Sequence, residues 1–193
     1  LYDINSGTWN RELLELFGVP EEALPTIVAS YGTVARTDPA LFLGLDVPIS
    51  GIAGDQQAAL VGHAGFSADS VKCTYGTGSF LLLHTGEAII HSEHGLLTTV
   101  ALAHPDQSGP DACARRDFAL EGSIFVTGAA VQWLRGGLGI IRESSEVEEH
   151  ARTVPDSGGV VFVPALNGLG APDWDPHARG LIIGISRGTT GAQ

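Results

Sequence analysis

The alternation of apolar and polar residues along the chain predicts short helices and strands that are separated by glycine. Near the start, apolar side chains at intervals of three and four predict an amphipathic helix with Ser6 or Thr8 as its N-cap. Gly18 and Pro20 end this run, because glycine favours a helix C-terminus and proline cannot continue a helix. We assign this helix a role in packing alone.

Further along, the pattern changes between strand and helix. Residues 47–54 ("VPISGIAG") predict an apolar strand and a glycine turn, and residues 55–63 ("DQQAALVGH") return to helical composition. Residues 71–86 ("VKCTYGTGSFLLLHTG") contain two β-rich runs around a Gly-Thr-Gly triplet, which predicts a hairpin. The small, polar, glycine-bearing stretch at residues 62–70 is the best candidate for a domain boundary.

The second half of the chain continues this mixture. Residues 104–117 ("HPDQSGPDACARRD") predict a solvated loop. Residues 118–139 predict a strand, a turn at Gly122 and a helix that ends at a glycine pair. Ser145 with Glu148 has the spacing of a capping box at the start of one more helix.

Two apolar runs near the end, residues 158–166 and 181–186, predict buried strands on either side of a long irregular loop at residues 167–180. Short buried strands mixed with helices and glycine loops indicate an α/β or α+β protein whose loops carry its function.

Composition and charge argue against several classes of function. The 193 residues are 44 % hydrophobic, so they can bury a core, but no apolar run approaches the roughly 20 residues that span a bilayer. The net charge of −12 argues against nucleic acid or an anionic membrane as the main partner. A bound phosphate would therefore be held by backbone N–H groups or a metal, because the chain has no lysine cluster.

The cysteines and histidines predict no metal site. Cys73 and Cys113 lack metal-ligand spacing, so a reducing cytoplasm is the expected compartment. His91 and His94 form the closest histidine pair, and without a matching second pair they do not predict zinc.

Several residues carry candidate chemistry, each with a plain structural alternative. Asp55 lies between a glycine-broken strand and a helix, where an aspartate is most often only an N-cap. The turn at Thr77 is either an ordinary hairpin or a phosphate-facing turn, with the hydroxyl and N–H groups as donors. Gly128 either packs closely on a neighbour or lets a nucleotide lie against the helix, with Gln132 one turn on. For Phe80, the alternative is a place in the core.

Taken together, seven separated blocks resemble the FGGY carbohydrate kinases, and within them the glycerol kinase branch. They include "PISGIAGDQQAAL" (48–60), "TYGTGSF" (74–80), "ALEGSIF" (119–125) and "GLGAPDWDP" (168–176). The blocks follow the order and approximate spacing of that family, and the one around Asp55 is diagnostic of the glycerol branch. The resemblance runs from residue 46 to residue 193, and more loosely through the first 45.

This resemblance implies an actin-like ATPase fold, in which two ribonuclease-H-like α/β domains surround a cleft that binds ATP with Mg²⁺ and glycerol. Residues 1–64 would end the N-terminal domain, and residues 70–193 would begin the C-terminal domain. The chain would be an internal segment without the N-terminal phosphate loop and the C-terminal end, and inactive alone. Assembly into a homo-oligomer is compatible with the resemblance.

The same resemblance assigns roles to single residues. Asp55 matches the catalytic base, and together with Gln56 and Phe80 it matches the glycerol contacts. Three positions match the nucleotide contacts: Thr77, Gly128 and Gln132. The implied reaction is the phosphorylation of glycerol to sn-glycerol 3-phosphate, with Asp55 accepting the hydroxyl proton. Two alternatives stay open, a sister kinase acting on another polyol or a pentulose, and a non-catalytic actin-like nucleotide-binding module.

Overall fold

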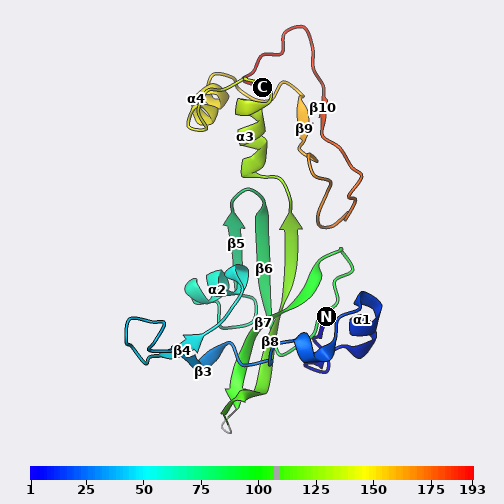
Figure 1. The fold of residues 1–193 in the computed structure, drawn as a ribbon. Coiled ribbons are helices and arrows are strands. Elements are labelled where there is room, and N and C mark those ends of the chain that lie inside the picture. The colour runs from blue at the N-terminus through cyan, green and yellow to red at the C-terminus, as the bar shows by residue number, and fades with distance from the viewer. Residues whose placement is uncertain (107–108) are drawn as a thin grey trace. The chain divides into compact units, whose positions relative to one another are not determined.

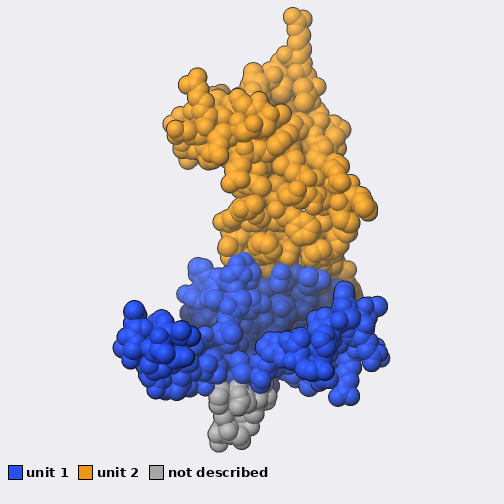
Figure 2. Space-filling view, in the orientation of Figure 1, with its two compact units in different colours: residues 1–72, 82–92, 97–121 blue, residues 73–81, 93–96, 122–193 orange. Residues whose placement is uncertain are grey.

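The structure is a computed structural model that describes residues 1–106 and 109–193, with side chains described outside residues 106–114 (Figure 1). It divides into two compact units (Figure 2). Unit 1 comprises residues 1–72, 82–92 and 97–121, and unit 2 comprises residues 73–81, 93–96 and 122–193. The expected domain boundary at residues 62–70 lies within unit 1, and that boundary stays a prediction.

A four-stranded sheet with the strand order β5-β6-β8-β7 is the largest element of the fold. Its strands are β5 (Val71–Tyr75), β6 (Ser79–Gly86), β7 (Leu97–Asp106) and β8 (Gly109–Ile124). β5 and β6 are neighbours joined by residues 76–78, which confirms the predicted hairpin. β7 and β8 pair antiparallel, with Leu97 opposite Glu121 and Asp106 opposite Gly109.

The β7–β8 hairpin overturns two predictions. The stretch at residues 104–117 is not a loop, because β7 continues to Asp106 and β8 begins at Gly109; residues 107 and 108 lie outside the described part. Polar residues can form these strands because the pairing is made by backbone groups. Register shifts on both sides of Pro105 accommodate this proline, which has no N–H to donate. Gly122 forms no turn either, since β8 runs through it to Ile124.

The apolar core of unit 1 lies between α2 (Asp55–Gly62) and the sheet, and α2 confirms the helix predicted at residues 55–63. The core cluster contains one residue from each of α2, β6, β7 and β8: Leu60, Leu82, Ala101 and Ala119. The side-chain amide of Gln57 also donates a hydrogen bond to the carbonyl of Val100 at 3.3 Å. These contacts hold α2 on the sheet and so place the residues of its first turn.

The remaining elements of unit 1 form small sheets and one helix. β3 (Tyr31–Arg36) pairs antiparallel with β4 (Pro48–Gly51), which confirms the strand predicted there. β1 (Tyr2–Asp3) pairs with β2 (Thr8–Trp9) and leads into α1 (Arg11–Phe17), and a 3₁₀ turn, η1 (Glu21–Ala23), follows.

The predicted N-cap of α1, Ser6 or Thr8, is wrong. The cap is Asn10, whose side chain accepts a hydrogen bond from the N–H of Leu13 at 3.0 Å. Thr8 is taken up by strand β2, so the helix starts later than its apolar spacing suggests. The predicted end is confirmed, because Gly18 has a left-handed backbone with φ of 63°.

Unit 2 contains α3 (Gly128–Gly136), α4 (Glu146–Arg152) and the antiparallel pair β9 (Val161–Val163) and β10 (Leu181–Ile183). Residues 167–180, all of them described, hold neither a helix nor a strand, as predicted. Of the helices that the described residues form, none has the length and apolar character needed to cross a membrane.

Two local predictions in unit 2 are wrong. Ser145 has a helical backbone (φ −63°, ψ −26°) and makes no side-chain capping bond to any described residue, while Glu148 pairs instead with Arg152. β9 and β10 are not buried within the described chain, since Val161 is 54 % and Ile183 58 % exposed. Trp133 of α3 stacks on Phe162 with ring centroids 5.6 Å apart, so one side of the pair is covered, while Val161, Leu181 and Ile183 stay exposed.

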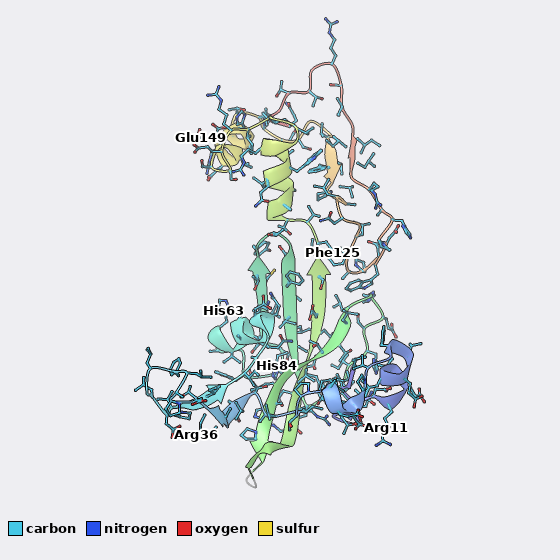
Figure 3. All side chains as sticks on the ribbon, in the orientation of Figure 1. Arg11, Arg36, His63, His84, Phe125 and Glu149 are labelled. Carbon is cyan, nitrogen blue, oxygen red and sulfur yellow. The ribbon has the colours of Figure 1, made fainter. Side chains whose placement is uncertain are left out.

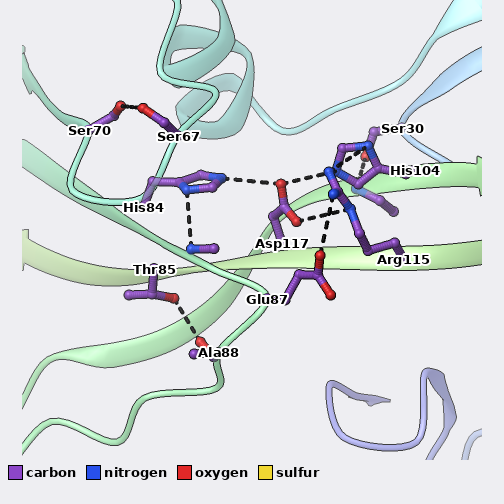
Figure 4. A network of polar contacts seen from close by, with 12 residues as sticks. Ser30, Ser67, Ser70, His84, Thr85, Glu87, Ala88, His104, Arg115 and Asp117 are labelled. Carbon is purple, nitrogen blue, oxygen red and sulfur yellow. Dashed lines mark hydrogen bonds and ion pairs between the residues drawn. The ribbon is translucent and has the colours of Figure 1, made fainter.

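A polar network lies inside unit 1 around Asp117 of β8, whose side chain is 6 % exposed (Figure 4). One carboxylate oxygen contacts Nε2 of His104 at 3.0 Å and Nε2 of His84 at 3.5 Å. The other oxygen lies 3.5 Å from Nε of Arg115, which also pairs with Glu87. Buried charges are tolerated when they are paired in this way, so the network specifies how β6, β7 and β8 align.

Candidate functional site

The carboxylate of Asp55 belongs to the first turn of α2 in unit 1. The N-cap of α2 is Gly54, whose backbone is extended (φ −63°, ψ 156°), so the prediction of Asp55 as the cap residue is wrong. Oδ1 of Asp55 accepts the backbone N–H of Gln56 at 2.9 Å, and Oδ2 accepts the Gln56 side-chain amide at 3.2 Å. The residue is exposed, and a carboxylate has about four acceptor positions, so both oxygens can accept further hydrogen bonds and either one can take up a proton.

A buried lysine extends this chain of contacts. Lys72 of β5 is 3 % exposed, and its ammonium donates a hydrogen bond to Oε1 of Gln56. The lysine, the glutamine and Asp55 therefore form a continuous line of polar contacts within unit 1. Sequence reasoning missed Lys72; the available signal was a single lysine inside an otherwise uncharged strand, residues 71–75.

In unit 2, the turn after β5 lies against the start of α3. The N–H groups of Thr127 and Ala129 donate to the carbonyl of Thr77 at 2.9 and 3.1 Å, and the N–H of Gly128 donates to the carbonyl of Gly76 at 2.9 Å. Ser79, which is buried, donates its hydroxyl to that of Thr127 at 2.8 Å. The structure thus brings together two predicted nucleotide residues, Thr77 and Gly128.

The close approach explains the glycine at the start of α3. A Cβ placed on Gly128 would lie 2.6 Å from the carbonyl oxygen of Gly76, closer than any side chain tolerates. The structural alternative for Gly128, close packing on a neighbour, is therefore correct, and it leaves a nucleotide role open. The N–H groups of residues 127–129 already donate to carbonyls of the turn. A ligand would therefore contact side chains or the exposed residues 76 and 77 of the turn.

The last two candidates also belong to unit 2. Gln132 is exposed and stands one helical turn after Gly128. Phe80 on β6 is half-buried, so it is not a full member of the core. The roles of all six candidates stay predictions, and the structure assigns Asp55 and Gln56 to unit 1 and the other four to unit 2.

The irregular loop at residues 167–180 is anchored within unit 2. The indole N–H of Trp174 donates to the carbonyl of Gly95 at 2.6 Å, and its ring packs edge to face on Phe125 with centroids 6.0 Å apart. Phe125 directly follows the end of β8 (Figure 3). A Cβ on Gly170 would lie 2.0 Å from the carbonyl oxygen of Ser123. Gly170 therefore permits close packing of the loop backbone on the end of β8.

Among the described residues, no group of three or more His, Cys, Asp or Glu side chains is arranged to hold a metal ion.

Comparison with known proteins identifies the family. The N-terminal domain of the FGGY family of carbohydrate kinases matches residues 1–62, and the C-terminal domain of that family matches residues 71–193. The chain belongs to the FGGY family of carbohydrate kinases. The resemblance drawn from the sequence blocks is thereby confirmed.

Curated relatives of this FGGY chain are glycerol kinases. It is 54 % identical over 189 residues to the enzyme of Gloeobacter violaceus and 52 % identical over 192 residues to that of Thermus brockianus. These matches cover 98 % and 100 % of this chain, but only 36 % and 37 % of the relatives. The chain thus spans little more than a third of the length of the curated relatives that it matches.

Solved structures agree with the family. The Plasmodium falciparum glycerol kinase with ADP superposes with a TM-score of 0.83 at 36 % identity, covering 100 % of this chain and 37 % of that one. A xylulose kinase from Rhodospirillum rubrum, at 24 % identity, has a TM-score of 0.71 over 98 % of this chain and 37 % of that one, and shares the fold. The predicted α/β fold of the actin-like ATPase type is confirmed.

Proposed function

We propose that a full-length FGGY kinase carrying residues 1–193 is a glycerol kinase, which transfers the γ-phosphoryl group of ATP to glycerol and forms sn-glycerol 3-phosphate. Identity of 52 to 54 % with curated glycerol kinases over nearly the whole chain is the observation that carries this proposal. We also propose, from the family, that residues 1–64 and 70–193 belong to two domains and that the enzyme uses Mg²⁺. A cytoplasmic location, assembly into a homo-oligomer and the inactivity of the 193 residues alone are further proposals from the family.

In the proposed reaction, a glycerol hydroxyl attacks the γ-phosphorus, the bond from phosphorus to the ADP oxygen breaks, and the hydroxyl proton passes to Asp55. Phosphoryl transfer needs alignment and charge neutralisation together with a carboxylate to accept this proton. The exposed Asp55 carboxylate, with both oxygens oriented by Gln56, supports that role. Gln56 and Phe80 contact glycerol in this proposal, and Thr77, Gly128 and Gln132 contact the nucleotide.

Two other functions make different predictions. A sister kinase would phosphorylate another polyol or a pentulose more efficiently than glycerol, and the xylulose kinase neighbours, at 24 % identity or less, support the shared fold alone. A non-catalytic nucleotide-binding module would show no acceptor-dependent turnover. The identity with glycerol kinases favours glycerol over both.

The test is a coupled ADP-release assay with glycerol, xylulose and ribitol as acceptors. It uses a polypeptide of the relatives' full length that carries residues 1–193 in place of the matched region of the Gloeobacter violaceus glycerol kinase; we call it the full-length kinase. We expect glycerol to have the highest kcat/KM. A higher kcat/KM for xylulose would contradict the proposal.

Gly128→Ala should weaken nucleotide binding in the full-length kinase. The added Cβ would lie 2.6 Å from the Gly76 carbonyl and push the start of α3 away from the turn that carries Thr77. Overpacking of this kind costs about 1–3 kcal/mol, so we expect the KM for ATP to rise about ten-fold, measured by steady-state kinetics.

The matched control is Gly136→Ala at the other end of α3, where no atom lies within 4 Å of an added Cβ. This variant should keep the KM for ATP, because alanine is a better helix residue than glycine and meets no clash. Equal KM values in the two variants would show that the close approach at Gly128 does not serve the nucleotide.

A further inference from the structure

We propose that Lys72 is a positioning residue for phosphoryl transfer: through the side chain of Gln56, it fixes the direction of the Asp55 carboxylate. The juxtaposition that carries this proposal is the line of contacts from the Lys72 ammonium to Oε1 of Gln56, and from Nε2 of Gln56 to Oδ2 of Asp55 at 3.2 Å. The inference rests on the proposed function, because it concerns the same base.

The chemistry of the three groups permits a single orientation of the Gln56 amide. An ammonium offers only donors, and an ionised carboxylate offers only acceptors. The amide between them must therefore direct its oxygen at Lys72 and its NH₂ at Asp55. A flipped amide would set oxygen against carboxylate and NH₂ against ammonium, so the charge of Lys72 excludes the flip.

The carboxylate is consequently held at both oxygens by one neighbouring residue. The backbone N–H of Gln56 bonds Oδ1 at 2.9 Å, and its side-chain amide bonds Oδ2. The backbone bond follows from the helix alone, whereas the side-chain bond requires Gln56 to keep one rotamer. Lys72 supplies the constraint on that rotamer from a different element, β5.

Burial makes the lysine a fixed anchor. Lys72 is 3 % exposed. It is the only lysine in the sequence, beside nine arginines. An exposed lysine swings freely and contributes little, but a buried one stays where its strand places it. The hydrogen bond from Gln57 to the Val100 carbonyl holds α2 on the sheet that contains β5, so the first turn of α2 keeps its position relative to Lys72.

The test compares four variants of the full-length kinase: Lys72→Met, Lys72→Arg, Gln56→Met and the double variant of Lys72→Met with Gln56→Met. Methionine removes the charge and the donors but keeps the volume. We expect Lys72→Met to lower kcat about ten-fold with the KM for ATP within two-fold, since a hydrogen bond to a charged group is lost. Lys72→Arg should recover most of kcat, because guanidinium retains donors.

The double variant separates positioning from a structural role. If Lys72 acts through Gln56, Lys72→Met should lower kcat less than two-fold further once Gln56 is methionine. Thermal unfolding midpoints of all four variants report folding separately. A merely structural lysine would lower the midpoint in both backgrounds while leaving kcat of the folded enzyme unchanged.

Three results would overturn the inference: wild-type kcat in folded Lys72→Met, wild-type kcat in Gln56→Met, or an equal effect of Lys72→Met in both backgrounds. If Lys72→Met does not fold, Lys72→Gln takes its place, because it removes the charge that excludes the amide flip and keeps a polar group at the buried position. Wild-type kcat in folded Lys72→Gln would then overturn the inference. Asp55→Asn, measured in parallel, keeps the two proposals apart. Asp55→Asn should lose turnover whether or not Lys72 has a role, so normal turnover in Asp55→Asn would contradict Asp55 as the base. Loss of turnover in Asp55→Asn together with normal kcat in Lys72→Met would contradict only the inference about Lys72.

Discussion

Asp55→Asn should lower kcat for glycerol phosphorylation in the full-length kinase by about 10²- to 10⁴-fold while the protein stays folded. Asparagine has nearly the same shape, and its amide oxygen can still accept the backbone N–H of Gln56 that Oδ1 accepts at 2.9 Å. The first turn of α2 therefore keeps its geometry. The substitution removes the proton acceptor together with the hydrogen bond that Oδ2 accepts from the Gln56 amide, because an NH₂ group cannot accept. Asp55 is exposed, so the loss should appear in the rate rather than in stability.

The measurement is steady-state ADP release with saturating glycerol and ATP, together with a thermal unfolding midpoint. The control is Asp46→Asn, which removes a carboxylate of the same unit that pairs with Arg36 at 2.6 Å on the surface. That variant should retain kcat. Turnover within a few-fold of wild type in Asp55→Asn would show that this carboxylate is not the base.

Asp117→Ala should lower the free energy of unfolding by about 1–3 kcal/mol, because it leaves the buried ring nitrogen of His84 and the half-buried one of His104 without their carboxylate partner. The Asp117 side chain is 6 % exposed, and its oxygens face His84, His104 and Arg115 at 3.0 to 3.5 Å. Removing the carboxylate affects His84 most, since its side chain is 3 % exposed and water reaches it poorly, whereas the half-exposed Arg115 keeps Glu87 as a partner. It also opens a space between strands that the alanine side chain does not fill.

The matched control is Glu148→Ala, which breaks an ion pair with Arg152 on α4, where the glutamate side chain is 72 % exposed. Exposed pairs of this kind contribute about 0.3–0.5 kcal/mol. Chemical denaturation of both variants of the full-length kinase measures the difference. A loss below about 1 kcal/mol for Asp117→Ala would mean that the histidines and the arginine find other partners.

The recognisable motifs lie where local sequence decides local structure. The Gly-Thr-Gly sequence at residues 76–78 allows a tight connection, and the β-rich runs beside it form β5 and β6 as predicted. The helix at residues 55–62 follows from its composition. The cap of α1 was mispredicted because Thr8 pairs with Asp3 in the β1–β2 sheet, and the residues of the helix do not reveal this pairing.

Long-range pairing decided the elements that were mispredicted. Residues 104–106 and 109–117 are polar and look like parts of a loop, yet they belong to β7 and β8, which pair through backbone bonds that composition does not reveal. The exposure of β9 and β10 has a related cause. Their apolar residues indicate burial, but within the described chain the two strands pair only with each other. Trp133 covers Phe162, whereas Val161 and Ile183 stay more than half exposed.

The sequence by itself determined the family and the candidate residues, because both depend on residue type and order: the blocks around Asp55 and Thr77 identify FGGY kinases without any coordinates. Only the tertiary structure decided what orients those residues. Lys72 and Gln56 are 16 positions apart and lie on different elements, so their contact exists only because α2 packs on the sheet that contains β5. A hydrogen bond depends on distance and direction between two atoms, and packing sets both.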